Sequence, residues 1–240
     1  MAFFISLLAA FILGAAKSGL KGMGVVIVTL MAFAFGAKAS TGILLPLLIF
    51  ADILAVSYYN RHAKWKYLIR FLPWMLVGVI VGAYLGKDLP EEIFKNGMAI
   101  IILVSVIIMF AWERYDKSNI PDKAWFAGSM GFTAGFTTMI GNLAGAFSNI
   151  FFLALRIPKN EFIGTAAWLY FIINIFKLPF HIFSWGTVNL ETLKTDLYLF
   201  PAVVVGFLVG IKLVEVFEEK QYRTFILVMT GVGALVLLIR

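Results

Sequence analysis

Long apolar runs, separated by short polar or glycine-rich stretches, make up almost the whole chain. Three of the runs approach the length of about 20 residues that a helix needs to cross the hydrocarbon core of a membrane. They are Gly42–Asn60, Phe162–Phe183 and Leu197–Val214. None of them shows the strict alternation of apolar and polar residues that is typical of a membrane β-strand. The pattern therefore predicts an all-α polytopic membrane protein.

Two shorter apolar runs open the chain, and a polar, glycine-rich break separates them. The runs are Ala2–Ala16 and Val25–Phe35, and the break is Lys17–Gly24. Neither run is long enough for a full membrane span. Irregular backbone at membrane depth is tolerated only where it is buried in protein or lines a cavity. We therefore expect the break to lie inside the protein, either as the tip of a re-entrant hairpin or as the turn between two short, tilted spans.

The same arrangement recurs in the second half of the chain. Apolar runs at Ala124–Thr137 and Ala146–Leu155 flank a second break, Thr138–Gly145. Such a recurrence favours an internal duplication over a chance resemblance between two glycine-rich segments. A shift of 122 positions aligns Gly19 with Gly141, Gly42 with Gly164, Asp52 with Asn174 and Ile53 with Ile175.

The duplication divides one integral membrane domain into a first repeat, residues 1–115, and a second repeat, residues 116–240. Each repeat contains about five helical segments, and the last of them is Phe225–Ile239. Because five is odd, the second repeat inserts in the opposite direction, so the repeats are predicted to be inverted. The first two segments of each repeat are short, and the two breaks are expected to meet near the midplane. This is a transporter architecture, although an architecture alone does not identify a substrate.

Composition and charge exclude several classes of protein. Of the 240 residues, 62% are hydrophobic and 14% are charged, which is more apolar surface than a soluble domain can bury. The net charge of +7 does not indicate nucleic-acid binding, because basic residues of membrane proteins collect in cytoplasmic loops. The densest basic cluster is Arg61–Arg70, which we expect to form such a loop. Two histidines and no cysteine offer no metal-ligand cluster, so we expect neither an enzyme nor a cofactor.

The first break carries the residue types that bind an anion. Lys17 and Lys21 supply positive charge, and Ser18 supplies a neutral donor. Gly22 and Gly24 allow close approach of the backbone to a ligand, and a helix that begins near Gly24 would direct its free N–H groups at the same place. Lysine at membrane depth is costly and is therefore expected to be functional. The alternative is that segment one is shallow and both lysines extend to the interface.

The second break offers neutral donors in place of charge. Thr137, Thr138, Gly141, Asn142 and Ser148 are expected to line the opposing tip. Hydroxyl and amide groups can coordinate an anion without adding charge. They can also satisfy the helix ends that the break leaves open, and the sequence does not decide between these two roles.

Further polar residues lie within the long apolar runs. Asp52 is expected to balance the lysine charge, or to take part in a proton-coupled cycle, and Asn174 occupies the matching place in the second repeat. Lys177 and His181 lie four positions apart, near the outer end of their segment. We expect these two residues to mark an outer entrance at the membrane interface, with a role in coupling or charge balance as the alternative.

Both breaks and their surroundings resemble the sulfite exporter TauE/SafE family, also known as the toluene sulfonate uptake permeases. The resemblance rests on Gly14–Gly24 with Leu44–Pro46, and on Gly135–Gly145 with Ile163–Thr165. It extends over essentially the whole chain, including its length, duplication and hydropathy.

The resemblance implies a multi-pass protein of the bacterial inner membrane that moves sulfite or an organosulfonate, with a small anion and the lipid bilayer as its partners. We expect alternating access, with proton coupling as an option, and a homodimer is consistent with this class of protein. Two alternatives stay open. One is a carrier for another small anion, such as a carboxylate, and the other is an anion channel of the same architecture.

Overall fold

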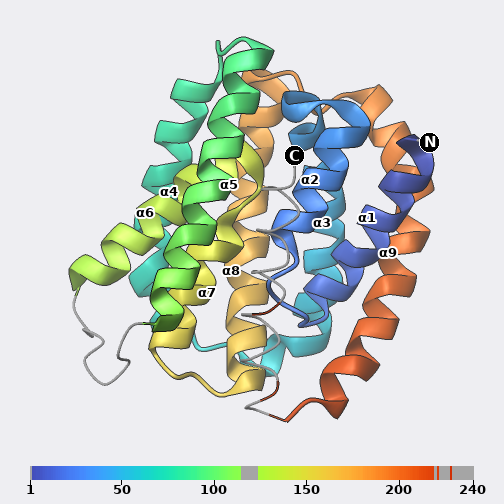
Figure 1. Ribbon diagram of the computed structural model, residues 1–240. Helices are drawn as coiled ribbons and strands as arrows, with labels where there is room; N and C mark the ends of the chain where they lie inside the picture. The colour runs from blue at the N-terminus through green and yellow to red at the C-terminus, as the bar shows by residue number, and fades with distance from the viewer. Residues whose placement is uncertain (1, 115–123, 219–220, 222–227, 229–240) are drawn as a thin grey trace.

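The computed structural model describes residues 2–114, 124–218, 221 and 228, and within them the chain is helical apart from short turns. Figure 1 shows the helices packed into one bundle, with α8 running through its middle. The first half contains α1 (Ala2–Lys17), α2 (Gly24–Phe35), α3 (Ala37–Tyr59), α4 (Trp65–Gly86) and α5 (Glu91–Arg114). The second half contains α6 (Ala124–Gly141), α7 (Ala144–Ala154), α8 (Lys159–Pro179) and α9 (Leu190–Val216). The predicted last segment, Phe225–Ile239, lies outside the described residues except for Val228.

Four helical stretches among the described residues are long and apolar enough to cross a membrane. They are Ala37–His62, Trp65–Gly86, Lys159–Ser184 and Leu190–Val216. The first and third of these include a short turn at their ends, the 3-10 turn η1 (Asn60–His62) and the π-helical turn η3 (Phe180–Ser184). The prediction of an all-helical polytopic membrane protein is confirmed at this level.

The two halves of the chain exchange their first helices. Helix α1 packs along α9, and α6 packs along α4, at opposite edges of the bundle in Figure 1. Glycines allow the backbones to touch: a Cβ atom on Gly14 would lie 2.0 Å from the carbonyl oxygen of Val203, and one on Gly135 would lie 1.9 Å from that of Met75. Both contacts exclude any larger residue. The first helix of each half is therefore fixed against the fourth helix of the other half.

Two helices begin earlier than the sequence pattern predicts: α3 begins at Ala37, before the predicted run Gly42–Asn60, and α4 begins at Trp65, inside the basic stretch Arg61–Arg70. The turn after α2 consists of Gly36 alone, because Glu91 caps the next helix: its Oε1 atom accepts hydrogen bonds from the backbone N–H groups of Ala37 at 2.8 Å and Lys38 at 3.3 Å. The basic stretch predicted as a loop, Arg61–Arg70, becomes η1 and the first turns of α4. In both places the helix gains backbone hydrogen bonds that a loop would leave to water.

Candidate functional site

The first break reverses the chain between α1 and α2 with two glycines in the left-handed region. Gly19 has φ of 130° and Gly22 has φ of 99°, values that residues with a Cβ atom rarely adopt. The Tyr59 hydroxyl donates a hydrogen bond of 2.6 Å to the carbonyl oxygen of Ser18, which ties the break to the end of α3. The break is therefore a defined turn, and its backbone conformation depends on glycine.

The second break joins α6 to α7 through Asn142 and Leu143. Asn142 has φ of 57°, in the left-handed region that asparagine tolerates better than most residues. Its Nδ2 atom donates a hydrogen bond of 3.2 Å to the carbonyl oxygen of Thr41 in α3. The second break is thus held against the first half of the chain.

The two breaks face a common cavity of about 80 Å³, which has room for a few water molecules or one small oxyanion. Gly22, Gly24 and Gly145 contribute backbone to its wall. The polar side chains that line it are Lys17, Lys21, Thr138, Asn142, Asn149, Tyr170 and Asn174. Residues from six helices and from both halves of the chain therefore converge on one small space.

Two helices begin at this cavity without a side-chain cap. The N-cap residues are Met23 for α2 and Leu143 for α7, and neither side chain accepts a hydrogen bond from the first turn of its helix. The first N–H groups of a helix have no partner within the helix, and the helix dipole makes its N-terminus positive. Two such ends at one cavity form an electropositive site for an anion.

Lys17 and Lys21 add full charge to the same space. Lys17 is 7% exposed and Lys21 is 5% exposed, so both ammonium groups are shielded from solvent. Lys17 forms a buried ion pair with Asp52, whereas Lys21 forms no ion pair within the described part of the chain. Both ammonium groups lie over the ring of Tyr170, at 4.7 Å and 5.3 Å from its centroid. The aromatic face offsets part of the cost of burying two cations.

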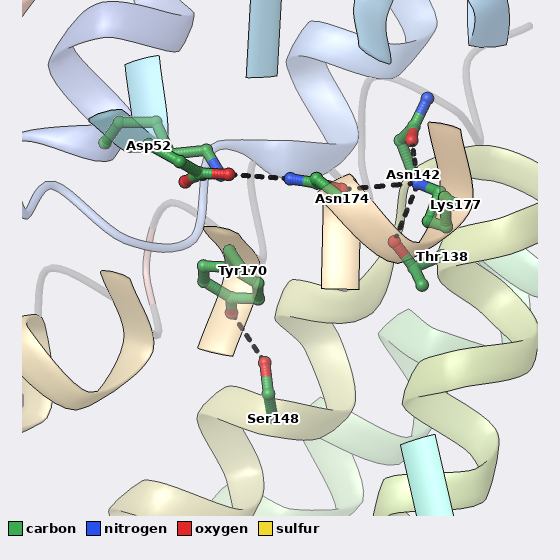
Figure 2. A network of polar contacts seen from close by, with 8 residues as sticks. Asp52, Thr138, Asn142, Ser148, Tyr170, Asn174 and Lys177 are labelled. Atoms are coloured by element: carbon green, nitrogen blue, oxygen red, sulfur yellow. Dashed lines mark hydrogen bonds and ion pairs between the residues drawn. The ribbon is translucent and has the colours of Figure 1, made fainter. Parts of the chain in front are cut away.

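A chain of hydrogen bonds extends from Asp52 to the second break (Figure 2). The amide of Asn174 donates to Oδ2 of Asp52 at 2.7 Å. On its other side, the amide oxygen of Asn174 accepts from Lys177 at 3.4 Å, and Lys177 also donates to Thr138 at 3.3 Å and to Asn142. One carboxylate and one ammonium group are thereby connected through a single asparagine.

The expectation that Lys177 and His181 mark an exposed entrance is wrong, since both side chains are fully buried. Lys177 is held by oxygen atoms of the second break, and these replace the water that an interfacial lysine would keep. His181 lies in η3, where its Nδ1 atom is 2.8 Å from the hydroxyl of Thr187. It shares no described hydrogen bond with the cavity residues.

Several predicted site residues make local hydrogen bonds instead of lining the cavity. The hydroxyl of Ser18 donates to the carbonyl oxygen of Ala15 at 2.8 Å, and that of Thr137 donates to the carbonyl oxygen of Thr133 at 2.8 Å. Gly141 ends α6 and does not border the cavity. Such bonds go to carbonyl groups of the helix on which each side chain lies or next to it, and they direct these hydroxyls away from the cavity.

Two polar residues that line the cavity were not predicted from the sequence. Tyr170 lies one helical turn before Asn174 on α8, and its hydroxyl is 2.6 Å from that of the predicted residue Ser148. Asn149 lies one turn after Gly145 on α7. The i, i+4 spacing from residues already suspected was a signal that could have identified both, because such pairs share one face of a helix.

The balance of charge around the cavity favours an anionic ligand. Among the described residues, the cavity and the hydrogen-bond network beside it contain three lysines, Lys17, Lys21 and Lys177, against the single carboxylate of Asp52. The described residues contain no group of three histidine, aspartate or glutamate side chains that could hold a metal ion. The arrangement is therefore suited to bind a small anion by charge and by backbone N–H groups.

Comparison with known proteins identifies the family of this chain. Residues 5–237 match the model of a protein family described as sulfite exporter TauE/SafE. No match was found among functionally curated proteins or among solved structures. Because the match extends over nearly the whole chain, the protein belongs to the sulfite exporter TauE/SafE family of membrane transporters.

Proposed function

We propose that the protein carries sulfite, or a small organosulfonate, across the bacterial inner membrane. The observation that carries this proposal is the cavity where two uncapped helix N-termini meet the ammonium groups of Lys17 and Lys21. Membership of the family supports a sulfur oxyanion as the substrate and export as the direction. The small volume of the cavity, about 80 Å³, favours a compact anion such as sulfite over a bulky sulfonate.

Alternating access between two inverted repeats, residues 1–115 and 116–240, is the proposed mechanism. Matched helix contacts support the repeats. A Cβ atom on Gly78 of α4 would lie 2.1 Å from the carbonyl oxygen of Phe132 in α6, and one on Gly206 of α9 would lie 2.0 Å from that of Phe11 in α1. Each of these glycines is followed four positions later by another glycine. A close contact between a glycine and a backbone carbonyl group thus joins α4 to α6 and α9 to α1, which are corresponding pairs of helices.

A pair of lysines supports the repeats independently. Lys38, at the start of α3, donates hydrogen bonds to the carbonyl oxygens of Lys87 and Leu89, just beyond the end of α4. Lys159, at the start of α8, donates to the carbonyl oxygens of Val214 and Phe217, at the end of α9. In each half, therefore, a lysine at the start of the third helix holds the end of the fourth.

Asp52 is the proposed point of coupling between anion binding and conformation. Without a ligand it neutralises Lys17, and an anion in the cavity competes with it for the same ammonium group. A displaced carboxylate can be stabilised by the amide of Asn174, or it can accept a proton. Either outcome would make the ion pair between α1 and α3 different in the loaded and empty protein.

The proposal is tested by transport into liposomes that contain the purified protein. We expect labelled sulfite to exchange against unlabelled sulfite inside the liposomes. Lys21→Met should lower the affinity of the protein for sulfite by at least about tenfold, since a hydrogen bond between charged groups is lost. Lys95→Met removes an exposed lysine and serves as the matched control. Exchange of carboxylates in place of sulfite would refute the substrate, and flux without counterflow would indicate a channel.

A further inference from the structure

One side chain in the cavity wall has a hydrogen-bonding group that the protein leaves unused. Asn149 on α7 is 2% exposed, and its Oδ1 atom has no hydrogen-bond partner among the described residues. Other buried polar atoms without a partner belong to Thr29, Trp168, His181 and Asp196, none of which borders the cavity. Asn149 borders both the main cavity and a smaller one between the starts of α2 and α7.

An unpaired amide oxygen at an anion site has a chemical meaning. Lysine ammonium groups and helix N-termini donate hydrogen bonds, so they recognise the oxygen atoms of a ligand. An amide oxygen accepts a hydrogen bond and would repel those same atoms. A buried acceptor without a partner is costly, and a ligand that brings a donor removes this cost. Asn149 therefore complements a part of the ligand that carries hydrogen.

We propose that Asn149 selects oxyanions that carry an O–H or N–H group beside their anionic oxygens. The inference rests on the proposed anion site and names its preferred ligand: a singly charged anion with a donor, such as hydrogen sulfite, in preference to an anion of the same shape without one. Lys21 and the two helix ends hold the oxygens, and Asn149 accepts the hydrogen. Each hydrogen sulfite carried in this way takes a proton with it.

Sulfamate and methanesulfonate separate the two properties of the ligand. Both are singly charged anions with three oxygens on sulfur, and they differ in an amino group against a methyl group. We expect the purified full-length protein to bind sulfamate at least about tenfold more tightly than methanesulfonate in direct calorimetric titration. In Asn149→Leu this preference should fall to within about twofold, because the acceptor is gone. Thr29→Val removes an unpartnered hydroxyl away from the cavity and should keep the preference of the parent.

Equal affinities in the parent, or tighter binding of methanesulfonate, would overturn the inference, as would an unchanged preference in Asn149→Leu. Asn149→Asp provides a second test because it keeps the acceptor: both affinities should fall through charge repulsion, but sulfamate should stay preferred. The proposed anion site fails in a different way. In that case neither compound binds, nor does sulfite, and Lys21→Met behaves like the parent. Such a result would also overturn the role of Asn149.

Discussion

Replacing Asp52 by asparagine should make the folded protein depend on a bound anion. The substitution keeps the shape of the side chain but removes the carboxylate that pairs with Lys17. Lys17 then remains buried near two other ammonium groups, those of Lys21 and Lys177, without any carboxylate among the described residues of the site. A sulfur oxyanion in the cavity would replace the missing charge. The empty variant should therefore be unstable, and the anion should stabilise it more than it stabilises the parent.

The size of the effect follows from the burial of the pair. Asp52 is 0% exposed and Lys17 is 7% exposed, so solvent screens their attraction little. Removing one partner of a buried ion pair costs about 3–5 kcal/mol. For a chain of this size, about 1 kcal/mol corresponds to a change in Tm of about 2–4 °C. The expected loss in Tm for the empty variant is thus about 6–20 °C.

Thermal unfolding in detergent, with and without sulfite, measures both parts of the prediction. Because a ligand stabilises only the state that binds it, the rise in Tm with sulfite reports its affinity for the folded protein. This rise should be larger in Asp52→Asn, where the anion no longer competes with a carboxylate. Asp88→Asn makes the same change at an exposed position and should leave Tm unaltered. If the empty Asp52→Asn protein melts within about 2 °C of the parent, the ion pair contributes little to the stability of the fold.

Further variants test the neighbouring contacts. The double variant Lys17→Met with Asp52→Leu should recover most of the Tm lost in Asp52→Asn, because replacing both partners by apolar residues leaves no uncompensated charge. It should also bind sulfite more weakly in titrations, since an ammonium group of the cavity is lost. A double variant as unstable as the single one would contradict this. Lys177→Met should lower Tm, because the buried oxygen atoms of Thr138 and Asn142 lose their hydrogen-bond donor. It should change the Kd for sulfite less than a substitution of Lys17 or Lys21 does. A larger loss of affinity would place Lys177 in the binding site. Gly78→Ala should cost at least about 1–3 kcal/mol in thermal or denaturant unfolding, since its Cβ would meet a backbone oxygen of α6, whereas Gly97→Ala has open space and should be tolerated.

The sequence pattern was sufficient to find the two breaks and part of the site. Lysine and asparagine between short apolar runs are conspicuous, because a charged or polar side chain is costly inside the membrane unless it has a function. Lys17, Lys21 and Asn142, predicted on this ground, all line the one cavity. The connection of Asp52 to its counterpart Asn174 could not be foreseen as a direct contact, although the repeat placed the two at matching positions.

Contacts between distant segments explain what the pattern could not predict. Lys177 seemed interfacial from its place near the end of a run, but oxygens of a break 35 and 39 positions earlier surround its ammonium group. Helix α3 starts earlier than expected because Glu91, 54 positions after Ala37, caps it. Asn149 and Tyr170 lie within the apolar runs Ala146–Leu155 and Phe162–Phe183, and no prediction was made for them. Periodicity within one helix indicates which side chains share a face, but it does not indicate what that face contacts.

The exchange of first helices between the halves has a consequence for how the protein is made. The face of α1 that carries Gly14 packs against α9, whose contact residue Val203 is synthesised almost 190 positions after Gly14. During synthesis α1 must therefore wait in the membrane with this face against lipid, while α6 can dock on the finished α4 as soon as it is inserted. A chain truncated before α9 would keep the α4–α6 pair but leave α1 without the helix that it packs along.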